Sequence, residues 1–133
     1  MKKISFCIIS VICCFAFFSC NLLPQTAVVT IKNSSGSEVR NITLSYEHAS
    51  KNQMQTVKIE RLANNESRPF ELELTSPSPA IGAGVATVFG EIEYWIDGKK
   101  FGMSDGNREI NLGDGARELI TINEKGWRVT RER

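Results

Sequence analysis

Apolar and polar residues alternate along most of the chain beyond residue 26. The clearest examples are residues 41–47 and 70–75, in which every second side chain is apolar. A period of two places one face of a β-strand against a core. Weaker alternation occurs in seven more segments, at residues 27–32, 55–62, 85–96, 99–103, 108–112, 118–123 and 127–130. No long stretch in this part carries the apolar stripe of an amphipathic helix, so the pattern predicts an all-β protein.

Short clusters of turn-forming residues separate these segments, among them Asn33-Ser34-Ser35-Gly36 and Asp97-Gly98. Asp-Gly favours the positive φ angles of a two-residue hairpin turn. Short strands at this spacing predict an antiparallel β-sandwich of seven to nine strands over residues 27–133, immunoglobulin-like in general plan. A small β-barrel is the alternative.

One stretch, from Thr75 to Gly90, is rich in proline, glycine and small apolar residues instead of alternating ones. Its Ile81-Gly82-Ala83-Gly84-Val85-Ala86 run suits a loop that touches a membrane or a partner's backbone. The favoured interpretation is a crossover loop that leads into a buried strand.

The first residues have a different pattern. Met1-Lys2-Lys3 precedes an apolar run from Ile4 to Phe18, followed by Ser19 and Cys20. As a helix this run reaches only about 22 Å, short of the roughly 30 Å hydrocarbon core of a bilayer. The layout therefore predicts a secretory signal peptide over residues 1–19 and disfavours a permanent membrane span.

The four cysteines, at positions 7, 13, 14 and 20, all lie in this N-terminal part, which excludes a disulfide framework for the domain. Phe17-Phe18-Ser19-Cys20 resembles the lipobox of bacterial lipoproteins, in the relaxed form of spirochaete lipoproteins with Phe17 at the usually aliphatic position. The resemblance implies that Cys20 is lipidated and becomes the mature N-terminus. Ordinary cleavage near Ser19, which would release a soluble protein, is the alternative.

This resemblance implies a lipid anchor in the inner or outer membrane of a bacterial cell envelope, with the domain in the periplasm or at the cell surface. Residues 20–26 would comprise the lipidated Cys20 and a tether, residues 21–26, that spans at most about 20 Å. The whole chain has 16 basic and 15 acidic residues. Without Lys2 and Lys3 the mature chain is nearly neutral, so we expect no nucleic-acid partner, and membrane attachment depends on the lipid.

Gly102-Met103-Ser104-Asp105-Gly106 matches the G-x-S-x-G nucleophile elbow of α/β-hydrolases. That elbow leads into a helix, whereas the residues after Gly106 alternate like a strand. The single histidine, His48, precedes the serine instead of following it. A hydrolase that uses Ser104 is therefore a remote alternative, and we expect no catalytic residue.

Metal and cofactor sites are not expected either. Asp105, Asn107 and Glu109 begin like a calcium-binding loop, but Ile110 and Ala116 stand where an EF-hand needs glycine and glutamate. One histidine and no cysteine beyond Cys20 exclude zinc and haem sites of the usual ligand types.

Trp95 is the best candidate for a binding residue. In residues 91–96, alternation places three apolar side chains on one face and Glu93 with Trp95 on the other, so Trp95 is expected to point outward. An exposed tryptophan is a common interface anchor, and the predicted partner surface comprises Trp95, Lys99, Lys100 and Phe101. The alternative is that Trp95 is packed in a sheet covered on both sides.

Together these features predict a membrane-anchored bacterial lipoprotein whose non-catalytic β-sandwich binds a protein or another cell-surface partner. A lipoprotein that holds a small ligand between its sheets is the second candidate. A dry cavity would support the ligand binder, and a filled core with an exposed apolar patch would support the interaction module.

Overall fold

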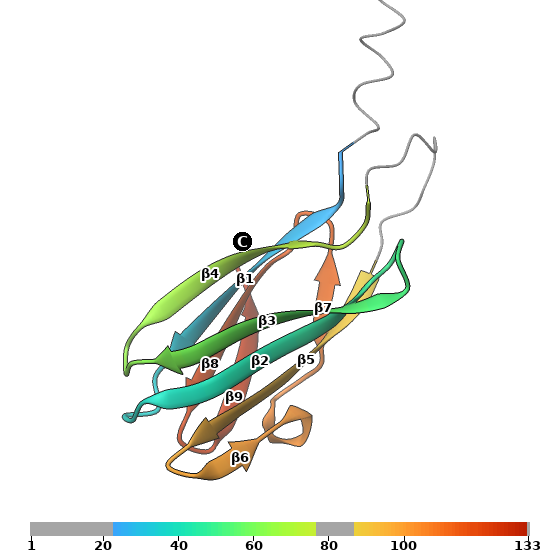
Figure 1. Cartoon of the computed structure of the whole chain (residues 1–133). Helices are drawn as coiled ribbons and strands as arrows, with labels where there is room; N and C mark the ends of the chain where they lie inside the picture. The colour runs from blue at the N-terminus through green and yellow to red at the C-terminus, as the bar shows by residue number, and fades with distance from the viewer. Residues whose placement is uncertain (1–22, 77–86, 133) are drawn as a thin grey trace, which may run out of the picture.

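The computed structural model describes residues 23–76 and 87–132 (Figure 1). Most of these residues lie in β-strands, as the alternation of apolar and polar side chains predicts. These residues form nine strands and one short 3-10 helix: β1 (Thr26–Asn33), β2 (Val39–His48), β3 (Gln53–Leu62), β4 (Ser67–Glu73), β5 (Thr87–Ile96), β6 (Lys99–Phe101), η2 (Met103–Asp105), β7 (Ile110–Gly113), β8 (Arg117–Asn123) and β9 (Gly126–Arg131).

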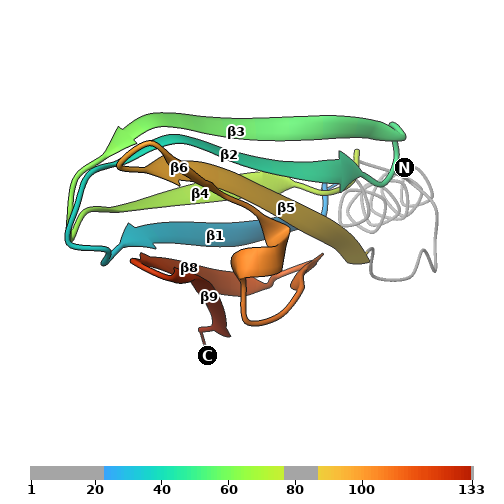
Figure 2. The same ribbon diagram turned by 90° about the horizontal axis from the view of Figure 1, so that it is seen from below.

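The strands form two sheets that pack face to face, as Figure 2 shows from below. One sheet has the order β4-β1-β8-β9, and the other has the order β3-β2-β5-β6, with β7 also paired to β5. The β-sandwich predicted from the sequence is confirmed. One pair departs from the antiparallel plan, because β1 runs parallel to β8, with Val29 opposite Glu118.

The core lies between the sheets. Burial alternates along β1 and β5, so that Val29 and Ile31 face inward from one sheet while Ile92 and Tyr94 face inward from the other. The inward side chains of both sheets pack as one hydrophobic cluster. Complete burial of an aliphatic or aromatic side chain contributes about 1.5–3 kcal/mol, so this cluster is the main source of stability.

A buried asparagine organises the turn after β1. The Asn33 side chain donates hydrogen bonds to the carbonyl oxygens of Ser37 (2.7 Å) and Leu62 (2.9 Å), and its Oδ1 accepts from the backbone N–H and the hydroxyl of Ser35. All polar atoms of this side chain therefore have hydrogen-bond partners, and these bonds offset the desolvation cost of burying the amide. The residue joins the β1–β2 turn to the end of β3.

The sandwich has two ends: the N-terminal end, where the chain enters at residues 23–25, and the opposite, distal end. At the N-terminal end, the Leu74 amide donates to Gln25 and the Ala49 amide donates to Leu74, both at 2.8 Å. The opposite, distal end holds the start of β2 and the end of β5, where Val39 pairs with Ile96. Residues near Ile96 thus lie at the end away from the chain's entry at residues 23–25 (Figure 1).

Candidate functional site

The outward face of the five-stranded sheet presents Trp95 at its distal end. Trp95 is 39% exposed, whereas Ile92, Tyr94 and Ile96 on the other face of β5 are buried. The predicted outward direction of Trp95 is therefore confirmed. No second layer covers this side within the described residues, since the two sheets pack through their opposite faces.

Charged side chains flank Trp95 on both sides. The register places Arg40 of β2 and Lys100 of β6 directly opposite it. Arg40 donates from Nε to Glu38 at 2.6 Å, and the Lys100 ammonium lies 3.0 Å from a carboxylate oxygen of Glu93. The cations next to the indole are therefore each matched by an acid on the same surface.

A small hollow lies beside the indole. It has a volume of about 220 Å³ and is lined by Glu38, Arg40, Trp95, Asp97 and Gly98. We call it the Trp95 groove. Asp97 and Gly98 both have positive φ angles, 48° and 78°, as the predicted two-residue hairpin turn requires. This tight turn fixes the wall of the groove next to β6.

Two of the four residues predicted for the partner surface lie elsewhere. Phe101 is buried and stacks on Tyr94, with ring centroids 5.1 Å apart, and Lys99 Nζ lies 4.7 Å from the centroid of the Phe101 ring. The reason is the register, which pairs Phe101 with inward-facing Tyr94 and leaves only Lys100 beside Trp95. Sequence reasoning missed Arg40 and Glu38, because it does not reveal that β2 pairs with β5. Asp97 lies in the predicted hairpin turn and is not part of the predicted partner surface.

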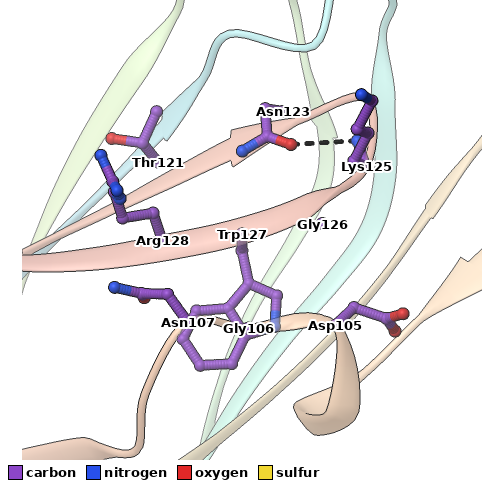
Figure 3. Close-up of a pocket in the computed structure, with 9 residues that line it drawn as sticks. All are labelled: Asp105, Gly106, Asn107, Thr121, Asn123, Lys125, Gly126, Trp127 and Arg128. Atoms are coloured by element: carbon purple, nitrogen blue, oxygen red, sulfur yellow. Dashed lines mark hydrogen bonds between the residues drawn. The ribbon is translucent and has the colours of Figure 1, made fainter.

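The second tryptophan, Trp127, packs inside the protein instead of lying on an open sheet face. Trp127 is almost fully buried, and its Nε1 donates to the carbonyl oxygen of Gly102 at 2.9 Å. Figure 3 shows its ring against the chain at Gly106, with which Trp127 forms an isolated parallel bridge. The Val129 amide donates to the Asn107 side chain at 2.8 Å. The β6–β7 loop (residues 102–109) thus covers the outer edge of β9.

An open groove of about 650 Å³ lies beside this contact (Figure 3). Its lining comes from the loop, β8, β9 and the turn between these strands: Asp105, Gly106, Asn107, Thr121, Asn123, Lys125, Gly126, Trp127 and Arg128. The groove lies at the surface of the sandwich and meets the hydrophobic cluster at Trp127.

The G-x-S-x-G motif forms the first part of the same loop. Ser104 is exposed on η2, and the Asp105 side chain accepts a hydrogen bond from the Gly102 amide at 2.7 Å. The chain then continues into β7, without the helix of a nucleophile elbow. His48, at the N-terminal end of the sandwich, has its Nε2 3.2 Å from Glu73. The motif's described contacts are those of a turn that closes a sheet edge.

Two of the three candidate calcium ligands, Asp105 and Asn107, are engaged in hydrogen bonds of this loop. Asp105 caps its own turn and Asn107 binds the β9 backbone, while Glu109 is exposed. Across residues 23–76 and 87–132, no group of three or more His, Cys, Asp or Glu residues is placed to hold a metal ion.

One buried carboxylate was not anticipated. Glu118 is 1% exposed and lies 3.2 Å from Arg108 and 2.9 Å from Arg131. Arg131, the last residue of β9, therefore has a structural partner. Alternation along β8 already places Glu118 inward with Ile120 and Ile122, and this signal could have revealed the need for counter-charges.

His48 is another buried side chain that can carry a charge. It is 1% exposed, and its Nδ1 has no hydrogen-bond partner among the described residues. Its Nε2 contact with Glu73 links the end of β2 to β4 in the other sheet. This arrangement holds the two sheets together at the N-terminal end and leaves the ring inaccessible to a substrate.

The described residues include no helix that is long and apolar enough to cross a membrane. Cys20, the predicted lipidation site, and most of the Ser76–Gly90 stretch lie outside the described residues. No protein family model matches the chain, and no curated protein matches it. Among solved structures, the NMR structure of a protein from Eubacterium rectale is similar at 19% identity and a TM-score of 0.46, covering 82% of this chain and 90% of that one. This similarity is too low to support an argument about function.

Proposed function

We propose that the protein is a lipoprotein of the bacterial cell envelope, anchored through Cys20, whose non-catalytic β-sandwich binds a protein or cell-surface partner at the Trp95 groove. The observation that carries the proposal is the exposure of Trp95 on a charged sheet face. Tryptophan is enriched among residues that dominate binding energies, because it buries a large rigid surface and also offers an N–H donor.

The location of Trp95 supports this function. The chain enters the sandwich at the N-terminal end, next to Gln25, while Trp95 lies at the distal end, opposite Arg40 near the start of β2. A lipid on Cys20, five residues before Gln25, would hold the N-terminal end near the membrane. Trp95 would then be presented away from the lipid surface, where an external partner can reach it.

The packing between the sheets supports an interaction module over a ligand carrier. Inward side chains from both sheets form one continuous cluster, which includes Tyr94, Phe101 and Trp127. A protein that holds a small ligand between its sheets would instead need a cavity among these residues.

A photoreactive amino acid placed at position 95 tests the binding surface. In native cells, irradiation is expected to give a crosslinked product from position 95 and none from position 89. Phe89 is the matched control, because it is an exposed aromatic residue on the outward face of the same strand. Equal products from both positions, or none from position 95, would contradict the proposed surface.

Mass spectrometry of the mature N-terminus tests the anchor. The expected species begins at Cys20 and carries a diacylglycerol on its sulfur. A mature protein with an unmodified Cys20 would contradict the lipoprotein assignment without affecting the binding surface.

A further inference from the structure

The composition of the Trp95 groove indicates the chemical class of its partner. Resting on the proposed function of this site, we infer that the groove binds one sugar ring of a neutral glycan, with the ring stacked on the Trp95 indole. The inference depends on three properties: the size of the groove, the pairing of both cations beside the indole with acids, and the hydrogen-bonding groups left unused around the indole.

The size of the groove fits a single ring. Its volume of about 220 Å³ is below the ~300–1,000 Å³ typical of pockets for drug-sized ligands and cofactors. One wall is the exposed indole, and a pyranose ring presents an apolar face of axial C–H groups that can lie flat against such a surface. A single sugar within a longer chain can occupy this space while its neighbours extend over the sheet.

The charges around the indole favour a neutral ligand. Arg40 is paired with Glu38, and Lys100 is paired with Glu93, so neither cation offers an uncompensated charge to an anionic partner. A cationic partner would have to compete with Arg40 for Glu38 and with Lys100 for Glu93. Asp97 forms no ion pair within the described residues, and its carboxylate is bonded to the neutral Ser37 hydroxyl. A ligand without net charge avoids both costs, since it need not break an existing ion pair.

Hydrogen-bonding capacity nevertheless remains at the rim. The ion pair uses Nε of Arg40, and no contact within the described residues uses its terminal nitrogens. Asp97 accepts from the Ser37 hydroxyl through Oδ2 at 3.2 Å, which leaves Oδ1 as an acceptor. A guanidinium donor and a carboxylate acceptor beside one aromatic ring match neighbouring sugar hydroxyls, because each hydroxyl both donates and accepts.

The same sheet face offers a contrasting apolar area at its N-terminal end. Phe89 is 61% exposed and Met54 is 57% exposed, and they line a shallow hollow together with Glu47 and Glu91. This hollow contains two acids but no basic side chain, so it lacks the donor that accompanies Trp95. Phe89→Ala therefore removes an exposed aromatic ring of the same strand without changing the proposed sugar site.

The test measures glycan binding by the full-length protein in detergent. The probes are an array of neutral oligosaccharides, including N-acetylglucosamine and glucose hexamers, beside acidic ones such as oligogalacturonate. We expect at least one neutral glycan to bind with an affinity that changes little between low and high salt. Trp95→Ala should weaken that binding at least about tenfold, while Phe89→Ala should leave it unchanged.

Each other outcome has a defined meaning. Binding restricted to acidic glycans, with a strong salt dependence, would overturn the neutral class. Equal losses from Trp95→Ala and Phe89→Ala would overturn the assignment to the Trp95 groove. An absence of glycan binding together with a protein crosslinked at position 95 would overturn this inference and leave the proposed function standing, whereas an absence of both would overturn the two together.

Discussion

The two tryptophans lie in regions that differ in burial and in hydrogen bonding. Trp127 is 2% exposed and lies where the β6–β7 loop covers the edge of β9, and its indole N–H bonds to Gly102. Trp95 is exposed on a sheet face, on a strand that is paired on both sides, with charged neighbours on the adjacent strands. One ring closes an edge that would otherwise present unpaired backbone groups, and the other remains available to a partner.

The difference shows that residue type alone does not indicate a role. In the Trp127 region, the indole N–H bonds to the backbone of Gly102 and the Asn107 side chain bonds to the backbone of Val129. In the Trp95 region, side chains pair with each other along the surface and leave hydrogen-bonding groups unused. The first region should therefore affect stability and the second should affect binding, and substitutions can separate these effects.

The largest effect is expected from Trp127→Ala. It removes a buried ring, its hydrogen bond to Gly102 and the cover of the β9 edge. The free energy of unfolding should fall by about 3–5 kcal/mol, the range for a buried aromatic replaced by alanine. Urea unfolding of the purified protein, followed by circular dichroism, measures this loss. Trp127→Phe is the control and should retain much of the packing, so an equal loss would contradict a packing role.

Gly106→Ala tests the same contact from the other side. A Cβ at position 106 would overlap the Trp127 ring, whereas a Cβ at Gly102 would meet no atom within 4 Å. We expect a loss of about 1–3 kcal/mol from Gly106→Ala, as for overpacked cores. Gly102→Ala should change the stability little. Similar thermal unfolding midpoints for the two variants would show that the loop does not pack tightly on Trp127.

The sequence predicts the local features well and the long-range ones poorly. Alternation in residues 91–96 predicts the exposure of Trp95 and the burial of Tyr94, because the direction of a side chain in a strand is a local property. The partners of Trp95 depend on the pairing of β5 with β2, which lie about fifty residues apart, and no local pattern reports that register. The predicted placement of Phe101 failed for a different reason, since the β5–β6 hairpin pairs it with inward-facing Tyr94.

The loop around Ser104 gives the same lesson. The glycines of its G-x-S-x-G motif are consistent with an enzyme elbow or with a tight turn, and only the position of Trp127 shows why position 106 requires glycine. That close approach joins the β6–β7 loop to β9. A sequence pattern of five residues contains no information about this contact.

Tyr94 lies between the two regions and allows a test at alkaline pH. Burial, together with the negative charge of Asp105, raises the pKa of Tyr94 well above its usual value. The buried neutral phenol therefore stabilises the fold fully below about pH 10, and this contribution is lost as the pH rises and tyrosine ionises in the unfolded chain. Wild-type stability should decline above pH 10 by up to about 1.4 kcal/mol per pH unit from this residue.

Tyr94→Phe should remove that part of the alkaline decline. At neutral pH the variant should differ from the wild type by less than about 1 kcal/mol, because the Tyr94 hydroxyl has no hydrogen-bond partner within the described residues. Tyr46, whose pKa is raised by burial and by Glu73, accounts for a remaining slope. Urea unfolding between pH 8 and 11 measures the difference. Parallel curves for variant and wild type would show that Tyr94 ionises normally.

The smallest effect on stability is expected from Trp95→Ala. The side chain is partly exposed, and the ion pairs of Arg40 and Lys100 do not involve the indole, so its removal leaves both pairs intact. We expect a change of less than about 1 kcal/mol in the free energy of unfolding, as for a surface substitution, together with a clear loss of partner capture. Urea unfolding and crosslinking with the same preparation measure the two quantities. A loss of several kcal/mol with unchanged capture would place Trp95 with Trp127 among the residues that hold the sandwich together, because the ring would then be stabilising the sheet and not a complex.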